Sequence, residues 1–200
     1  MLKFLLFIFF AFSSASNINN TLLDFLYDET GWVLDNTLED GSAVYVKNND
    51  NVSLQAIKIS RNIKINPLIV LDIIQNVENY NSVLTSSSNI TTTPIFSDSS
   101  IVAKQYISIP ILSDLYYFFK IYQSENRVYW LLENFDQYTE MHDSAHPLSI
   151  GCGGWDYKKL NDEIYTVNYR LIFDIDGYPS WVVNYINYYS LLNVYNDVIN

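Results

Sequence analysis

Residues 165–181 read YTVNYRLIFDIDGYPSW, and this stretch decides the fold. Apolar and polar side chains alternate from Tyr165 to Ile175, a period of two that predicts an antiparallel strand covered on one side only. Asp176-Gly177 is a strong turn dipeptide, and Pro179 suits the first position of a helix. We therefore expect a long C-terminal helix that folds back onto the apolar face of a sheet.

The expected C-terminal helix carries an apolar arc wider than one sheet face needs. We predict that part of this arc lines a cavity, whereas the alternative for any single residue is ordinary core packing. The apolar stripe consists of Trp181, Tyr185, Tyr188, Leu192, Tyr195 and Ile199. The side expected to face water consists of Asn184, Asn187, Ser190, Asn193, Asn196 and Asn200.

Length and composition indicate one domain with a sizeable core. The chain has 200 residues, of which 49% are hydrophobic and 16% aromatic. Twenty-two acidic residues against 11 basic ones give a net charge of −11, which repels phosphate backbones and argues against nucleic acid as a partner. Cys152 is the single cysteine, so no intrachain disulfide can form, and we expect its thiol to be buried.

The first 16 residues have the layout of a secretory signal peptide. Lys3 precedes an apolar run from Phe4 to Phe12, and small residues follow at 13–16. We therefore expect export from the cytoplasm, to the periplasm or the exterior, with an uncleaved anchor or a buried first helix as the alternative. Residues 17–30 are expected to form a short helical extension ahead of the main domain at 31–200.

Between these ends the sequence predicts antiparallel strands and one further helix. A hairpin turns at residues 39–41, and Asn66-Pro67 opens the helix. Residues 85–100 are rich in Ser, Thr and Asn and are expected to be a loop with one edge strand. The expected strands are 31–36, 43–47, 52–65, 101–109, 116–123, 127–135, 154–160 and 165–175.

Several local motifs resemble the START domain, a lipid-binding branch of the helix-grip superfamily. Gly31-Trp32 and residues 43–46 look like the family's opening strand and hairpin. Residues 110–114 look like its Pro-containing turn, and residues 154–157 look like its Gly-x-Trp strand. The most specific match is residues 174–184, DIDGYPSWVVN, which are very similar to the segment that leads into the C-terminal helix of bacterial members.

The resemblance implies an α+β helix-grip fold, in which a curved antiparallel sheet wraps around the long C-terminal helix. It implies that the chain is a monomeric, non-enzymatic protein that binds a lipid or other hydrophobic molecule in an internal tunnel, with transient membrane contact. No cofactor and no metal are expected. The residues expected to contact the ligand are Gln105, Tyr116, Phe118, Trp130, Leu132, Tyr169, Leu171, Trp181, Tyr185 and Tyr188.

Departures from the family pattern concern the polar groups. The turn at 110–114 keeps Asp114 but has Ser113 where the family usually has Arg. The acid–base pair that the resemblance places on the two central strands is missing, with Gln105 on the first of them. Arg170 falls on the polar face of its strand, so we expect it to face solvent.

The two histidines occur close together. His142 and His146 mimic the spacing of a zinc motif, but Pro147 follows at once and no third ligand is evident. The resemblance instead implies that this loop gates the mouth of the tunnel. Two alternatives to a carrier stay open: a polyketide-cyclase-like enzyme on the same fold, and an interaction module whose cavity is filled by its own aromatic side chains.

Overall fold

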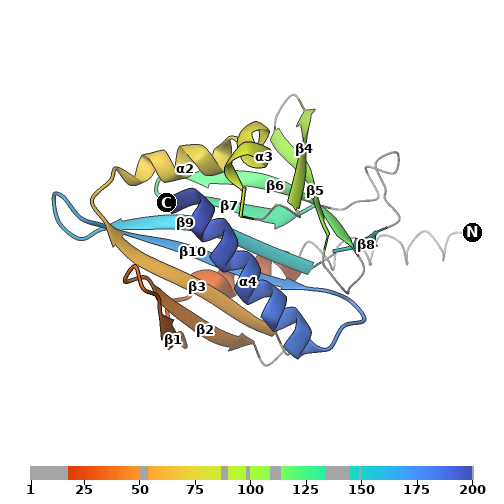
Figure 1. The fold of residues 1–200 in the computed structure, drawn as a ribbon, viewed down its shortest axis with the longest axis horizontal. Helices are drawn as coiled ribbons and strands as arrows, with labels where there is room; N and C mark the ends of the chain where they lie inside the picture. Colours follow the sequence, from red (N-terminus) through yellow and green to blue (C-terminus); the bar gives the residue numbers. More distant parts are fainter. Residues whose placement is uncertain are drawn as a thin grey trace, which may run out of the picture.

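The structure is a computed structural model, which describes residues 18–49, 54–86, 90–97, 100–108, 114–133, 145–148 and 150–199. Its main feature is a curved antiparallel sheet crossed by the long helix α4 (Ser180–Ile199), as Figure 1 shows. The predicted α+β helix-grip class is confirmed. The strand order is β1-β2-β3-β10-β9-β7-β6-β5-β4, and the two-residue β8 pairs in parallel with β6.

The observed elements follow the predicted ones closely. Asn66 caps the helix that starts at Pro67, and β4 lies at the edge of the sheet, both as expected. The strands are β1 (Val33–Thr37), β2 (Ala43–Asn49), β3 (Leu54–Ile63), β4 (Ile90–Ser97), β5 (Ser100–Ile107), β6 (Leu115–Ser124), β7 (Arg127–Leu132), β8 (His146–Pro147), β9 (Ile150–Lys159) and β10 (Tyr165–Asp174). Besides α4, the helices are α2 (Pro67–Gln75), the 3-10 helix η1 (Val77–Asn79) and α3 (Tyr80–Val83), and residues 18–27 are also helical.

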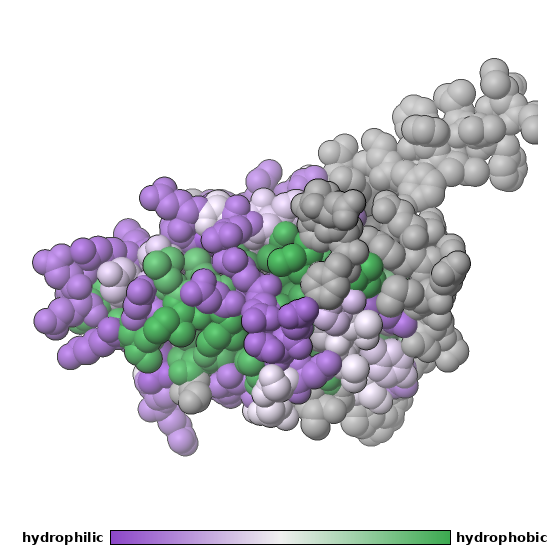
Figure 2. Space-filling model, turned by 90° about the horizontal axis from the view of Figure 1, so that it is seen from above, coloured by the Kyte–Doolittle hydropathy of each residue, from purple (hydrophilic) through white to green (hydrophobic). Residues whose placement is uncertain are grey.

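Helix α2 closes one end of the concave side, where it packs against β7, β9 and α4. Its inner residues Val70, Leu71 and Ile74 are buried. Leu68 and Ile69 are 47% and 52% exposed, and Figure 2 shows apolar surface among polar side chains when the molecule is viewed from this end. No helix among the described residues is long and apolar enough to cross a membrane.

The convex face of the sheet is also covered, by the helix at residues 18–27. Leu22 and Leu26 of this helix are almost fully buried. The amide of Asn19 donates to the carbonyl oxygen of Leu132 and accepts from the backbone N–H of Gly151. The expectation that the last strand is covered on one side only is therefore wrong, because the N-terminal helix occupies the side predicted to face water.

Arg170 is buried because the N-terminal segment covers the convex face of the sheet. The prediction that it faces solvent is wrong, since the side chain is 1% exposed. Its guanidinium donates to the carboxylates of Asp156 and Glu29 and lies 4.9 Å from the ring centroid of Tyr27. Burial lowers the pKa of Arg170, and the charge of Glu29 opposes that shift. A cation on the outer face is thus held by acids from the N-terminal segment and from β9.

Two lysines extend this arrangement along the outer face. The Lys47 ammonium donates to the backbone oxygens of Phe25 and Asp28, at 2.8 and 2.9 Å. The Lys58 ammonium lies 3.0 Å from a carboxylate oxygen of Glu29 and 4.7 Å from the ring centroid of Trp32. Hydrogen bonds from Thr30 and Lys47 lower the pKa of Asp28 to about 2. The N-terminal segment is therefore fastened to the sheet by charge as well as by apolar contact.

Helix α4 is fastened to the concave side at a gap between β3 and β10. These strands pair from Tyr165–Ile63 to Leu171–Ile57, and the same register, continued by two residues, would pair Phe173 with Gln55. Instead, Asn184 accepts from the Gln55 N–H at 3.0 Å, and Asn187 bonds both the N–H and the C=O of Phe173. Two asparagines of α4 thus replace the backbone pairing where the two strands separate.

We predict that Arg170→Met lowers the free energy of unfolding by about 3 kcal/mol, because it leaves the mostly buried Asp156 without its cation. Chemical denaturation followed by circular dichroism measures the change. The control is Lys159→Ala, which removes an ion pair with the fully exposed Asp162 and should cost less than about 0.5 kcal/mol. Equal losses in the two variants would contradict a special role for the buried cation.

We also predict that Asn187→Ala costs about 2–4 kcal/mol, because two buried backbone groups of Phe173 lose their partner. Asn196→Ala, at an exposed position of the same helix, should change stability by less than about 0.5 kcal/mol. Denaturant titration of both variants provides the comparison. The gap between β3 and β10 would not be an anchor for α4 if both variants were as stable as the parent chain.

Candidate functional site: an aromatic cavity beneath helix α4

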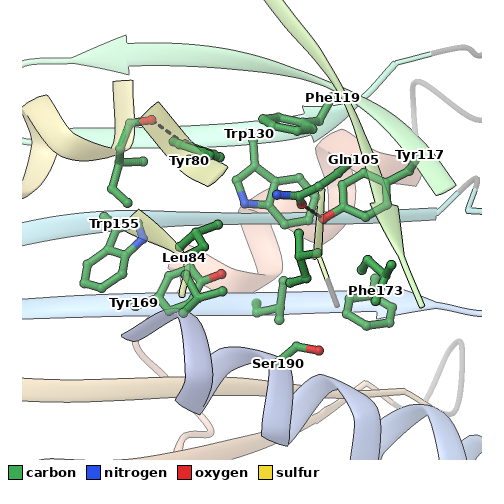
Figure 3. Close-up of a pocket in the computed structure, with 15 residues that line it drawn as sticks. Tyr80, Leu84, Gln105, Tyr117, Phe119, Trp130, Trp155, Tyr169, Phe173 and Ser190 are labelled. Carbon is green, nitrogen blue, oxygen red and sulfur yellow. Dashed lines mark hydrogen bonds between the residues drawn. The ribbon is translucent and has the colours of Figure 1, made fainter. Parts of the chain in front are cut away.

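A cavity lies between the concave face of the sheet and the helices α2, α3 and α4 (Figure 3). Its wall is almost entirely apolar and aromatic, as in most small-molecule sites. The side chains come from nine helices and strands and from the loop after α3. The lining residues are Ile74, Tyr80, Leu84, Ile90, Gln105, Ile107, Tyr117, Phe119, Trp130, Trp155, Tyr169, Leu171, Phe173, Ser190 and Val194.

The cavity is narrow, with a free volume of about 60 Å³. This is room for a few water molecules, whereas small-molecule pockets usually measure roughly 300–1,000 Å³. An acyl chain therefore does not fit between the walls as they stand. In this closed form the cavity is therefore smaller than a tunnel that holds a lipid, and any large ligand requires the walls to move apart.

One polar line crosses the wall on three neighbouring strands. Thr92 of β4, Gln105 of β5 and Tyr117 of β6 are direct cross-strand partners. The Gln105 amide donates to the Thr92 hydroxyl at 3.0 Å, and the Tyr117 hydroxyl donates to the Gln105 oxygen, as drawn in Figure 3. Asn81 bonds both backbone groups of Thr92, which fixes the outer end of the line.

Trp155 and Tyr169 form the opposite part of the wall. They are cross-strand partners on β9 and β10, and their rings stack with centroids 4.5 Å apart and planes 9° from parallel. Tyr195 of α4 also stacks with Trp155, with ring centroids 6.0 Å apart and planes 6° from parallel. Burial raises the pKa of Tyr169, so this hydroxyl stays protonated at any physiological pH.

No charged side chain belongs to the wall in the described part of the chain. The lysines of the central strands point away from it: Lys104 lies over the ring of Tyr116 and Lys120 over that of Tyr122, both on the outer face. The cavity therefore offers neutral hydrogen-bonding groups only. A buried ion would lack a partner of opposite charge there, at a cost of several kcal/mol.

Four of the ten residues expected to contact a ligand lie on the cavity wall. Gln105, Trp130, Tyr169 and Leu171 are brought together from β5, β7 and β10. Leu132 shares the concave face with Trp130 and is buried, but it lies in the core beside the cavity.

Two residues of β6 that were expected to contact the ligand point away from the cavity. Tyr116 and Phe118 are buried on the outer face, where their rings meet edge to face, and Tyr117 and Phe119 line the cavity instead. The sequence YYFF at 116–119 is apolar on both faces, so alternation could not indicate which pair faces inward.

The expected face of the C-terminal helix is also wrong. Trp181 and Tyr185 are 73% and 60% exposed, and Tyr188 is partly buried against the core but absent from the cavity wall. The residues of α4 on the wall are Ser190 and Val194. The buried line of α4 runs through Val183, Asn187, Leu191, Tyr195 and Val198.

The sequence reasoning also missed Tyr80, Phe119, Trp155 and Phe173 as wall residues. Trp155 and Phe173 stood in strands that were predicted correctly, and strand alternation alone could have placed Phe173 beside Leu171 and Tyr169. A small residue makes room for one wall ring: a Cβ on Gly153 would lie 2.9 Å from the indole of Trp130.

The gating and metal expectations fall only partly on described residues. His142 lies outside them. His146 is in β8, pairs with Leu115 and contacts the ring of Tyr178, next to the start of α4. In the described ranges, no three His, Cys, Asp or Glu side chains gather as they would around a metal ion. Cys152 is fully buried, as predicted, and burial raises the pKa of its thiol.

Comparison with solved structures identifies the fold. No protein-family model and no curated protein matches the chain. Among solved structures, a STAR-related lipid transfer protein from Xanthomonas axonopodis matches with a TM-score of 0.65 at 16% identity, over 84% of this chain and 96% of that one. Human STARD10 matches with a TM-score of 0.64 at 15% identity, over 90% and 78% of the two chains.

Human StAR-related lipid transfer protein 5 matches over 93% of both chains, with a TM-score of 0.63 and 13% identity. The chain thus has the helix-grip fold of START-domain proteins, as the sequence motifs implied. At these identities the likeness concerns the fold, and the function has to be argued from the cavity.

Proposed function

We propose that the chain binds an uncharged hydrophobic small molecule, such as a neutral lipid, in the cavity beneath α4, without catalysing a reaction. The observation that carries this proposal is the cavity wall, which is built of aromatic and aliphatic side chains around the neutral Gln105–Tyr117 pair. The structures of similar fold carry lipid transfer in their names, and this supports the same assignment. Burying each methylene of a ligand gains about 0.8 kcal/mol.

Uptake requires the wall to open, and the contacts of α4 indicate where. Its first half is held by the buried Asn187, and its second half by the buried Tyr195, whose hydroxyl lies 2.9 Å from that of Ser42. Beyond Tyr195, the Asp197 carboxylate accepts from the Ser86 backbone N–H at 2.9 Å on the exposed surface. Exposed polar contacts cost little to break. We propose that the end of α4 beyond Tyr195 and the loop after α3 move apart when a ligand enters.

One specific observation favours a second function. A free volume of about 60 Å³ fits an interaction module whose cavity is filled by its own aromatic rings. Such a module would keep α4 closed and would take up no ligand. The cyclase alternative has less support, because no carboxylate or imidazole belongs to the wall among the described residues.

The expectations about location and assembly stay predictions. Residues 1–16 lie outside the described residues, so export through a signal peptide rests on the sequence pattern alone. A monomeric state and transient membrane contact are likewise proposed with the carrier function. An exported carrier would meet its ligand outside the cytoplasm.

The proposal predicts saturable, one-to-one binding of the neutral dye Nile Red to the purified chain, measured by fluorescence titration. Val194→Trp should weaken binding at least tenfold, because the added ring fills the cavity from α4. Asn196→Trp, on the exposed side of the same helix, should leave the affinity unchanged. Thermal unfolding of both variants confirms that they are folded.

Ser190→Leu provides a smaller obstruction if Val194→Trp proves unstable, and it should weaken binding in the same direction. Equal dye affinity in the cavity variants and in Asn196→Trp would place the dye elsewhere and contradict the proposal. Absence of any saturable binding would favour the interaction module.

A further inference from the structure

Two of the most deeply buried polar groups on the wall have no partner within the described part of the chain. Trp155 is 1% exposed and Tyr169 is 5% exposed. Neither the Trp155 indole N–H nor the Tyr169 hydroxyl makes a hydrogen bond to a described residue. Figure 3 shows the indole nitrogen and the phenol oxygen turned toward the interior of the cavity.

This contrasts with the other buried tyrosines of the wall. The Tyr80 hydroxyl donates to the Ile74 carbonyl oxygen, and the Tyr117 hydroxyl donates to Gln105. Buried polar groups in proteins are nearly always hydrogen-bonded, and leaving one unpaired costs roughly 1–3 kcal/mol. Donors that face a cavity without a protein partner are therefore placed to meet a ligand.

The balance of donors and acceptors defines the ligand's polar group. An indole N–H donates only, and the Gln105 amide has a second N–H beyond the one given to Thr92. Tyr169 can also donate, so the free groups on the wall are mainly donors. A matching ligand supplies an acceptor, and a carbonyl oxygen with two lone pairs can receive two of these bonds.

An ionised ligand does not suit this cavity, because it would find no counter-charge on the described part of the wall. Lys104 and Lys120 lie on the outer face, and no cation borders the cavity among the described residues. A carboxylate or phosphate would lose its hydration without gaining a counter-charge. A neutral carbonyl compound gives up far less hydration.

We propose that the cavity selects an uncharged apolar molecule with a ketone, aldehyde or ester carbonyl, whose oxygen accepts hydrogen bonds from Tyr169 and Trp155. This proposal rests on the proposed function, because it names the class of ligand for the same cavity. Tyr169 is then a specificity-determining residue. Its hydroxyl serves the ligand and does not stabilise the closed fold.

The test is a thermodynamic cycle between two probes and two chains. Displacement of Nile Red gives the affinities of 2-undecanone and of undecane, which differ in the carbonyl oxygen. Tyr169→Phe should lower the affinity ratio of ketone to alkane by about five- to tenfold, the value of one hydrogen bond. Solvation of the free probes is the same for both chains and cancels when their two ratios are compared.

Tyr80→Phe is the matched control, since it removes a wall hydroxyl that the protein already uses. It should lower the unfolding midpoint and leave the probe ratio unchanged, whereas Tyr169→Phe should raise the midpoint, because it removes an unpaired buried hydroxyl. With the carbonyl carbon of the ketone labelled with ¹³C, the carbonyl stretch should move to lower frequency on binding to the parent chain and less on binding to Tyr169→Phe.

The outcomes separate this inference from the proposed function. If neither probe displaces the dye, the proposed function itself fails. If both probes bind and their ratio is the same in Tyr169→Phe, the carbonyl assignment is overturned while binding stands. Tighter binding of ionised decanoate than of 2-undecanone at pH 8 would also overturn it.

Discussion

The fold depends on the place where β3 and β10 separate and asparagines of α4 take over their backbone hydrogen bonds. Asn187 satisfies both backbone groups of Phe173, and Asn184 accepts from the opposite Gln55. Without these amides, buried backbone groups would be left unpaired at the centre of the molecule. The anchor fixes the first half of α4 against the sheet and sets its second half over the cavity, so the site is a consequence of this junction.

A second constraint acts on the opposite face. The sheet carries Arg170, Lys58 and Lys47 outward, and the segment that contains Asp28 and Glu29 covers them. Buried cations are tolerated only when partners of opposite charge and hydrogen bonds compensate their lost hydration. Because both faces of the central strands are covered, we expect any movement on ligand uptake to occur in the helices that close the cavity.

The sequence predicted the elements well and the orientation of their side chains less well. Strand alternation, the Asp176-Gly177 turn and the Asn66-Pro67 cap are local signals, and the structure contains each of them. The inward face of α4 could not be predicted, because tyrosines surround the helix and its buried Asn187 serves a gap between strands far away in sequence. Arg170 was expected to face solvent because it lies on the polar face of its strand. Nothing in the local sequence reveals that Glu29 lies beside it. The cavity volume depends on how rings from many elements pack together, which no single pattern in the chain encodes.

Under the proposed function, the closed cavity opens to hold a neutral ligand against the wall opposite Gln105. A crystal structure of the chain grown with 2-undecanone tests this most directly. We predict the alkyl chain between α4 and the sheet, the carbonyl oxygen within hydrogen-bonding distance of Tyr169, and the C-terminal end of α4 displaced from Ser86. A structure in which the ketone occupies only the outer surface, with the aromatic wall closed as described, would contradict the account.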